Sequence, residues 1–343
     1  MTCNQFAPPA ELIQAINRHG SFVLAAHVNP DADALGSLLG LQFILEKLGK
    51  KTLAWTEEPV NHLYRFFPGA DKTVSDVARL EAFCSADQGD CALLTLDCGD
   101  KKRLGREMDR LLAIHPTLVI DHHLGHREFG DLNWIVADRS STGEMVHDLA
   151  KELLPSLPPE ACFSLFAAIC ADTGSFRYEC ASAHTFRVAA DLVEGGVRPD
   201  IVTSHLFDNF SPARLRLLQQ VLASLELHID ESVAVACVTR KMLDVTGSSM
   251  EDTDGFINYL RALQQVQVAI FLKETDDVLS VSLRAKGRCN VAEIAQAFGG
   301  GGHRNAAGFR YPGHDMKELK RKLLASLAPC LEKNATSNGC GIH

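Results

Sequence analysis

A short segment near the N-terminus, residues 27–37, brings together three side chains that commonly bind metal ions. His27, Asp31 and Asp33 lie within seven residues, and Pro30 keeps the turn tight enough for them to converge. Two carboxylates in one small loop repel each other unless a positive charge neutralises them. A mixed set of imidazole and carboxylate ligands suits Mn, Fe, Zn or Co better than Ca. The segment therefore predicts a metal site, and the alternative is an Asp-rich turn in which Asp33 caps a helix.

Two further polar clusters follow apolar runs that we predict to be buried strands. Asp97 ends the run of residues 91–96, and it is a candidate to bridge two ions or, alternatively, a turn residue before Gly. Asp121, His122 and His123 close the next apolar run. Side chains of adjacent residues diverge, so one histidine can bind a metal while the other faces an open cleft. Two neighbouring imidazoles both need polar partners, which argues against a role in core packing.

Asp172 lies at the end of a nearly all-apolar helix that we expect over residues 160–171. An acidic side chain at the C-terminus of a helix is unfavourable with respect to the helix dipole. A bound cation would compensate for that cost, and the alternative is an exposed helix end. Asp172 is therefore a further candidate metal ligand.

The second half of the chain carries a glycine-rich segment and a nearby arginine. Four consecutive glycines lose much conformational entropy on ordering, but they let backbone N–H groups approach an anion closely. A flexible linker is the alternative, although a linker would not stand between a predicted helix and the Ala-Ala-Gly of residues 306–308. Arg284, at the end of a predicted strand, could hold a phosphate or carboxylate through two hydrogen bonds. The candidate substrate contacts are Arg284, Gly300, Gly301, Gly302 and His303.

The elements that must position these side chains alternate in the first half of the chain. Strands are expected at residues 22–26, 52–55, 91–96 and 117–120, and helices at residues 34–48, 61–67 and 103–114. Such alternation predicts a mostly parallel α/β sheet flanked by helices. Ligands bind such sheets beyond the carboxyl ends of the strands, where the polar clusters stand.

The pattern becomes helical after residue 142 and returns to strands after residue 225. We predict a catalytic domain over residues 1–190, a helical linker over 191–225, and a smaller α/β domain with a mixed sheet over 226–335. Strands at 233–238, 266–271 and 278–283, a helix at 291–298 and a closing helix at 316–331 make up this last domain.

Composition limits the class of protein. The 343 residues suit two domains, and a hydrophobic content of 46% is typical of folded cores. The net charge of −9 argues against coating nucleic acid by bulk electrostatics, but not against binding a short nucleotide in a local basic pocket. With no signal segment and no long apolar run, we expect a cytoplasmic protein without a membrane partner.

Taken together, these segments resemble the DHH phosphoesterase family. The segment from His27 matches its first motif, Asp97 the second, the Asp121–His123 cluster the third and Asp172 the fourth. The Gly-Gly-Gly-His run from Gly300 is similar to the signature of the DHH-associated C-terminal domain. The resemblance covers about residues 10–330 and is greatest to the nanoRNase branch. Those enzymes degrade very short oligoribonucleotides, and many also remove the 3′-phosphate of 3′-phosphoadenosine 5′-phosphate.

The resemblance implies a centre of two divalent ions, usually Mn, that activates water for attack on phosphorus. The implied ligands are His27, Asp31 and Asp97 for the first ion, and Asp33, Asp97, His122 and Asp172 for the second, with Asp97 bridging. His123 would either contact the phosphate or assist the leaving oxygen. The C-terminal residues would grip the phosphate or terminal nucleotide, and a homodimer is compatible with the resemblance.

Three other functions share parts of this pattern. The substrates could be the linear products of cyclic dinucleotides, pApA and pGpG. A non-catalytic nucleotide sensor could use the same pocket, although a pure binder has no need of every ligand. An inorganic pyrophosphatase on the same core is disfavoured by the Gly-Gly-Gly-His segment, because such enzymes carry a different, Lys-rich C-terminal domain.

Overall fold

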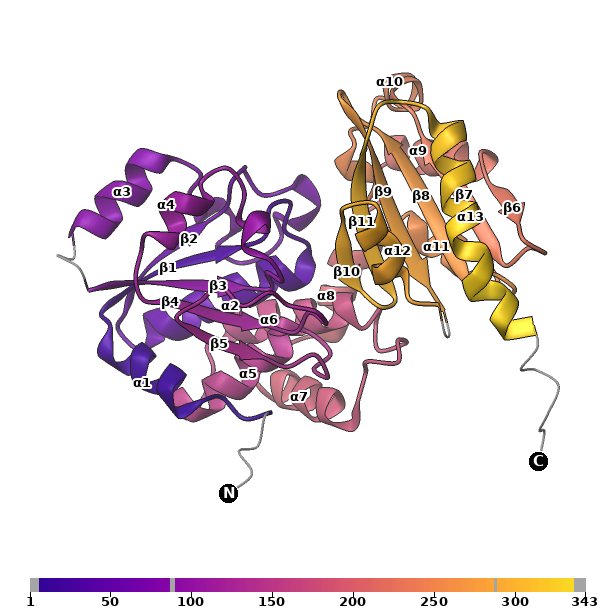
Figure 1. Ribbon diagram of the computed structural model, residues 1–343. Helices are drawn as coiled ribbons and strands as arrows, with labels where there is room; N and C mark the ends of the chain where they lie inside the picture. The colour runs from indigo at the N-terminus through magenta and orange to yellow at the C-terminus, as the bar shows by residue number, and fades with distance from the viewer. Residues whose placement is uncertain (1–5, 87–89, 287–288, 336–343) are drawn as a thin grey trace. The chain divides into compact units, whose positions relative to one another are not determined.

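The computed structural model describes residues 6–86, 90–286 and 289–335 (Figure 1). Its tertiary contacts divide the chain into two compact units, Met1–Asn209 and Phe210–His343. The first unit contains a parallel sheet with helices, and the second, shorter unit contains a mixed sheet. The predicted fold class is therefore confirmed.

The sheet of the first unit has five parallel strands in the order β2-β1-β3-β4-β5. The strands are β1 (Ser21–Ala26), β2 (Lys51–Trp55), β3 (Cys91–Leu96), β4 (Thr117–Asp121) and β5 (Leu132–Ile135). The first four lie where the apolar runs predicted them, whereas β5 was not predicted. Strand order reverses between β1 and β3, because β2 lies on one side of β1 and the later strands on the other. Such a switch point opens a crevice at the carboxyl ends of the strands.

The helices of the first unit agree with the prediction where they are long and apolar. They are α1 (Ala10–Arg18), α2 (Ala32–Lys47), α3 (Val77–Ala86), α4 (Met108–Leu112), α5 (Thr142–Leu153), α6 (Pro159–Asp172), α7 (Ala183–Glu194) and α8 (Pro199–Phe207). The helix predicted over 61–67 is only the 3₁₀ turn η1 (His62–Tyr64), and α1 and α3 were not predicted. The helix predicted over 103–114 is wrong at its start, because Gly105, with φ of 90°, separates the 3₁₀ turn η3 (Lys101–Leu104) from α4.

Helices α2 and α6 pack closely against each other, and both are apolar on nearly all sides. Two glycines of α2 permit this approach. A Cβ atom on Gly36 would lie 2.6 Å from the carbonyl oxygen of Ser164, and one on Gly40 would lie 2.7 Å from Cδ2 of Leu165. Because Asp33 lies in the first turn of α2 and Asp172 ends α6, this packing also fixes the separation of two predicted metal ligands.

The second unit is built on a six-stranded sheet in the order β10-β11-β9-β8-β7-β6. Its strands are β6 (Glu226–His228), β7 (Val233–Val238), β8 (Val268–Glu274), β9 (Val278–Ala285), β10 (Gly301–His303) and β11 (Ala306–Pro312). Its helices are α9 (Pro212–Ala223), α10 (Arg240–Thr246), α11 (Ile257–Arg261), α12 (Val291–Ala297) and α13 (Met316–Ala335). Among these six described strands, only β7 and β8 pair in parallel, and the other neighbours are antiparallel. Residues 191–225 contribute to both units, and the predicted three-part division stays a prediction.

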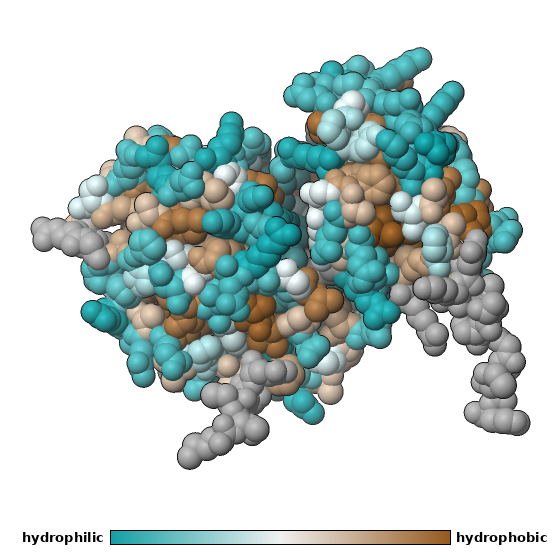
Figure 2. Space-filling view, in the orientation of Figure 1, coloured by the Kyte–Doolittle hydropathy of each residue, from teal (hydrophilic) through white to brown (hydrophobic). Residues whose placement is uncertain are grey.

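Hydrophilic residues cover most of the face of each unit seen in Figure 2, and the hydrophobic residues between them form small patches. Scattered exposed apolar side chains of this kind are ordinary for folded domains. Within the described ranges, none of the helices combines the length and the apolar character needed to cross a bilayer.

Candidate metal centre

Histidine and aspartate side chains gather at the carboxyl ends of β1, β3 and β4, at the start of α2 and at the end of α6. They form three groups: His27, Asp31 and Asp97; Asp33, His122 and Asp172; and Asp97, His122 and His123. Within each group, one possible ligand atom of each residue lies within 4.8 Å of the others. Because Asp97 and His122 each belong to two groups, the three groups make one continuous centre. The structure thus brings together every metal ligand that the sequence proposed.

His122 is the meeting point of three carboxylates. Its Nε2 atom lies 3.5 Å from Asp33 Oδ2, 3.5 Å from Asp97 Oδ1 and 3.4 Å from Asp172 Oδ2. Burial would lower the pKa of His122, but the carboxylates of Asp172, Asp33 and Asp97 outweigh it and raise that pKa to about 10. A single imidazolium proton therefore neutralises part of this charge in the metal-free protein. A divalent cation at the same position would do so more completely.

A backbone carbonyl fixes the orientation of His27. Its Nδ1 lies 2.8 Å from the carbonyl oxygen of Val28 and donates to it, so the lone pair of the neutral ring is on Nε2. That Nε2 lies 3.6 Å from Asp97 Oδ2 and 4.0 Å from Asp31 Oδ2. The free lone pair of His27 is thus directed at the carboxylates with which it would share an ion.

His122 is oriented in the same way by Arg139. Its Nδ1 lies 3.2 Å from the Arg139 carbonyl oxygen. Arg139 is itself buried, and its guanidinium contacts Glu144 at 3.1 Å and Asp148 at 2.5 Å. Arg139 was not predicted to belong to the site, because a buried arginine ahead of a helix has no sequence pattern of its own.

Asp31 and Asp33 have different roles in α2. Asp31 is the N-cap residue, and its Oδ1 accepts hydrogen bonds of 3.1 Å from the backbone N–H groups of Asp33 and Ala34. The alternative in which Asp33 caps the helix is therefore wrong, because Asp33 already lies in the first turn. The Asp31 side chain is 56% exposed, whereas Asp33 is 2% exposed. The first of the two predicted metal-binding positions is thus the more open to solvent.

The first turn of α5 holds the buried Asp33 carboxylate. Its Oδ2 accepts a hydrogen bond from the N–H of Thr142 at 2.8 Å, and its Oδ1 accepts from Gly143 N and Ser37 Oγ, both at 3.0 Å. The Thr142 hydroxyl also donates to Asp97 Oδ1 at 3.1 Å. Despite these bonds, burial and the nearby Asp97 carboxylate raise the pKa of Asp33 well above its usual value. Thr142 was not recognised as part of the site from the sequence.

The other two carboxylates also have unusual settings. Asp97 has a φ of 54°, which is uncommon for a residue other than glycine and is typical of strained functional sites. Burial would raise the pKa of Asp97, but the His123 and His27 rings hold it well below its usual value. Burial raises the pKa of Asp172 to about 6, although the His122 ring opposes that rise.

His123 is engaged at both ring nitrogens. Its Nδ1 lies 2.7 Å from Asp121 Oδ1, and its Nε2 lies 3.2 Å from Nη1 of Arg103. The second oxygen of the fully buried Asp121 contacts Nδ1 of His126 at 2.5 Å. Burial would raise the pKa of Asp121, but the His123 and His126 rings hold it below its usual range. Neither Arg103 nor His126 was recognised as part of the site from the sequence.

The predicted substrate contacts all lie in the second unit. Arg284 pairs with Ala306 across β9 and β11, and its Nη1 donates to the neighbouring Leu283 carbonyl at 3.1 Å. A Cβ atom on Gly300 or Gly302 would overlap the backbone of β11, whereas one on Gly301 would meet nothing within 4 Å. His303 ends β10, where only its backbone is described. Close approach to β11 thus accounts for two of the three glycines, and the roles of these residues in substrate binding stay predictions.

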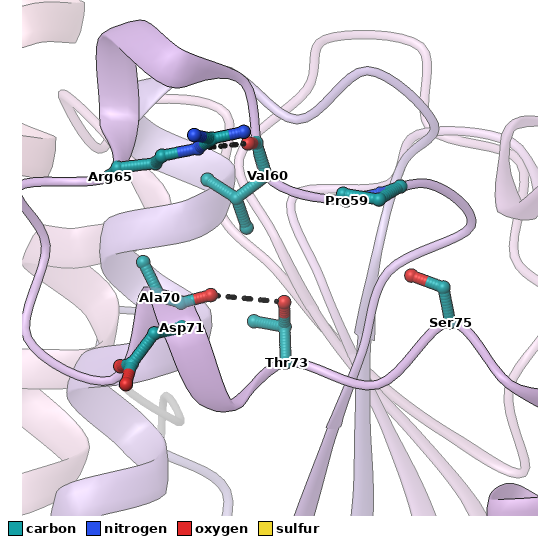
Figure 3. A pocket seen from close by; sticks show the side chains of 7 residues that line it. All are labelled: Pro59, Val60, Arg65, Ala70, Asp71, Thr73 and Ser75. Carbon is teal, nitrogen blue, oxygen red and sulfur yellow. Dashed lines mark hydrogen bonds between the residues drawn. The ribbon is translucent and has the colours of Figure 1, made fainter.

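A separate cavity of about 370 Å³ lies in the segment between β2 and α3 (Figure 3). Its lining residues are Pro59, Val60, Arg65, Ala70, Asp71, Thr73 and Ser75. Arg65 Nε donates to the Val60 carbonyl at 3.5 Å, and Thr73 Oγ1 donates to the Ala70 carbonyl at 3.1 Å. None of these residues belongs to the His and Asp centre, and we assign no function to the cavity.

Comparisons with known proteins agree with this architecture. Residues 21–169 match the family model of the DHH family, N-terminal domain, and residues 230–332 match that of the DHHA1 domain. The chain is 30% identical to the bifunctional oligoribonuclease and PAP phosphatase NrnA of Thermus thermophilus, over 93% of this chain and 92% of the relative. It is 27% identical to a probable bifunctional oligoribonuclease and PAP phosphatase NrnA of Streptococcus mutans, over 87% and 91% of the two chains. A crystal structure of an exopolyphosphatase-related protein from Bacteroides fragilis has a TM-score of 0.85 and 25% identity, with 94% and 96% coverage.

Proposed function

The chain belongs to the DHH family, and we propose that it is a metal-dependent phosphoesterase that acts on short oligoribonucleotides. The proposed second substrate is 3′-phosphoadenosine 5′-phosphate. The observation that carries the proposal is the single centre in which four carboxylates and two oriented imidazoles converge. The names of the similar proteins from Thermus thermophilus and Streptococcus mutans support the choice of substrates.

The donor set fits a pair of divalent ions, for which Mn is our choice. The proposed ligands are His27, Asp31 and Asp97 for one ion, and Asp33, Asp97, His122 and Asp172 for the other. Imidazole and carboxylate donors suit first-row transition metals, and the mutual repulsion of buried carboxylates favours a cation between them. When bound, such ions make a nucleophile from water at neutral pH and offset the charge of a phosphoryl group.

The protein side chains then supply orientation and proton control. His27 and His122 each have Nδ1 occupied by a carbonyl oxygen, so both present Nε2 without a choice of tautomer. His123 directs its Nδ1 at the buried Asp121 carboxylate, so its Nε2, which lies 3.2 Å from Nη1 of Arg103 in the free protein, is the ring nitrogen that would meet a substrate. We propose that Nε2 of His123 faces the phosphoester.

The second unit would provide the grip on the substrate. Arg284 offers a planar set of donors suited to a phosphate, and the segment 300–302 offers backbone N–H groups without side chains. Recognition of one terminal phosphate or nucleotide suits substrates of a few nucleotides, because such substrates have little else to bind.

The test is an incubation of the full-length Mn-loaded protein with an RNA dinucleotide and, separately, with 3′-phosphoadenosine 5′-phosphate, followed by chromatography of the products. We expect mononucleotides from the first substrate and orthophosphate from the second, with turnover abolished in Asp97→Asn. Linear pApA and pyrophosphate serve as comparison substrates. Binding of the dinucleotide without turnover would indicate a nucleotide sensor and would contradict the proposal.

A further inference from the structure

Arg103 has an unusual position for a cation beside an acidic centre. It lies in η3, between β3 and α4, and its side chain is half-buried. Among the described residues, its guanidinium makes one hydrogen bond, from Nη1 to Nε2 of His123 at 3.2 Å. Within the described part of the chain, no carboxylate oxygen lies within 4.0 Å of that guanidinium. Arginine has five N–H donors, so most of this donor capacity has no partner in the part of the chain that the structure describes.

The neighbouring arginines are placed differently. Arg106 forms ion pairs with Glu57 and Glu58, and Arg110 pairs with Glu107 at 2.9 Å. Both of these arginines have largely exposed side chains. A half-buried guanidinium without a carboxylate partner is therefore a property of Arg103 within this segment, and Arg106 offers a matched control.

The backbone fixes Arg103 to the metal-binding loops. Its carbonyl oxygen accepts a hydrogen bond of 2.8 Å from Val28, the residue after His27, and its N–H donates to the Asp100 carbonyl at 2.9 Å. The partner ring of His123 packs on Gly99, where a Cβ atom would lie 3.1 Å from that of His123. Arg103 is thus held between the loops that follow β1 and β3.

The contact between Arg103 and His123 also defines the proton positions. Arginine can only donate, so Nε2 of His123 must accept, and the ring proton must be on Nδ1 facing Asp121. The two side chains therefore present Nε2 of an imidazole and a full positive charge on the same side of the centre. An anionic substrate is the partner that this arrangement lacks.

We propose that Arg103 is a catalytic residue that donates hydrogen bonds to a non-bridging oxygen of the substrate phosphoryl group. This inference rests on the proposed function. In the free protein, Nε2 of His123 holds the Arg103 guanidinium in place. When substrate binds, the phosphoryl oxygens accept hydrogen bonds from the N–H groups of Arg103. Donors preorganised toward oxygens on which charge develops stabilise the transition state more than the ground state.

The first test compares Arg103→Ala with Arg106→Ala in the metal-loaded full-length protein. We expect kcat on an RNA dinucleotide to fall on the order of 100-fold in Arg103→Ala, with metal content unchanged, and to stay near the wild-type value in Arg106→Ala. Free guanidinium ion added to Arg103→Ala should restore part of the lost rate. Equal kcat values for the two variants would overturn the proposal.

A second test separates contact with substrate from mere support of His123. The affinity for AMP, a product-like probe that needs no turnover, is measured by calorimetry for Arg103→Ala, His123→Ala and the double variant. We expect Arg103→Ala to weaken AMP binding about tenfold in both backgrounds, the loss of a charge-assisted hydrogen bond. No further weakening in the His123→Ala background would mean that Arg103 acts only through His123, and the proposal would be wrong. Because AMP binding requires no hydrolysis, this result is independent of whether the proposed activity is found.

Discussion

The backbone N–H of Thr142 donates a hydrogen bond of 2.8 Å to Oδ2 of Asp33, a residue 109 positions earlier in the chain. The hydroxyl of the same threonine donates to Asp97 Oδ1 at 3.1 Å. The first turn of α5 thus orients carboxylates that arrive from two different strand ends. A helix N-terminus is suited to this task, because its free N–H groups and its dipole both favour negative charge.

Replacement of Thr142 by valine removes the hydroxyl bond to Asp97 while the backbone bond to Asp33 remains. We expect the affinity for Mn to fall by about 10- to 100-fold, since Asp97 loses a partner that fixes its orientation. Calorimetric titration of the metal-free protein measures this change, and Thr142→Ser, which retains the hydroxyl, is the control. An unchanged affinity in Thr142→Val would show that the other ligands suffice to orient Asp97.

Gly36→Ala should destabilise the first unit. Alanine favours helices over glycine by about 1 kcal/mol, but the new Cβ would lie 2.6 Å from the Ser164 carbonyl of α6, and overpacking of this kind costs about 1–3 kcal/mol. Gly40→Ala is the comparison variant, because its Cβ would meet the side chain of Leu165, whereas that of Gly36→Ala would meet a backbone carbonyl. Urea unfolding of both variants should therefore show a lower midpoint for Gly36→Ala, and the reverse order would contradict the packing argument.

Metal binding should release protons near neutral pH. The carboxylates of Asp172, Asp33 and Asp97 raise the pKa of His122 to about 10, so its ring is protonated in the metal-free protein at pH 7.5. Coordination requires the neutral ring, so the proton must leave, and the apparent metal affinity should rise as pH increases toward 10. Titrations in two buffers of different ionisation enthalpy count the released protons, and His122→Ala should release fewer. Metal uptake without proton release would contradict the assignment of His122 as a ligand.

Removal of divalent metal should lower the melting temperature. Asp33 and Asp97 are each 2% exposed, and without a cation their repulsion opposes folding. A metal that binds only the folded protein adds about 2.7 kcal/mol at a concentration 100 times its Kd. Thermal unfolding with EDTA, and then with excess Mn, measures the difference. Asp97→Asn should show a smaller response, and an equal response would place the stabilising ion elsewhere.

Gly301→Ala tests the second unit without disturbing its fold. A Cβ atom there meets nothing within 4 Å, so we expect the melting temperature and metal content to be unchanged. If the segment approaches a substrate phosphate, the methyl group should raise KM for a dinucleotide several-fold with little change in kcat. Gly300→Ala is the contrasting variant, since its Cβ would overlap Phe309 and Gly308 and should destabilise the unit. An unaltered KM in Gly301→Ala would argue against close approach.

Much of the fold was predictable because the strands that carry the ligands are short, apolar and followed at once by polar residues. Strands β1, β3 and β4 are fully or almost fully buried and left clear apolar runs. The edge strand β5 has only one buried residue, Trp134, and leaves no such run. The break before α4 depends on the backbone conformation of Gly105, which residue type alone does not reveal.

The convergence of the predicted metal ligands was likewise predictable, but the orientation of their side chains was not. The tautomer of His27 depends on the carbonyl of Val28, and that of His122 on the carbonyl of Arg139. The backbone of any residue type could supply such a carbonyl, so the sequence contains no signal for it. The role of Thr142 was missed for a related reason, since its contacts to Asp33 and Asp97 require the packing of α5 against the sheet.

The distribution of the ligands along the chain has a consequence for biosynthesis. His27 emerges from the ribosome early, whereas Asp172 comes at the end of α6, the helix that packs on the glycine face of α2. A nascent chain that stops before α6 lacks both the last ligand and the apolar wall behind the first segment. Under the proposed assignment, the ligand set of the second ion is complete only once α6 has docked, so capture of that ion would follow the docking. The proposed ligands of the first ion, His27, Asp31 and Asp97, all precede α6 in the chain.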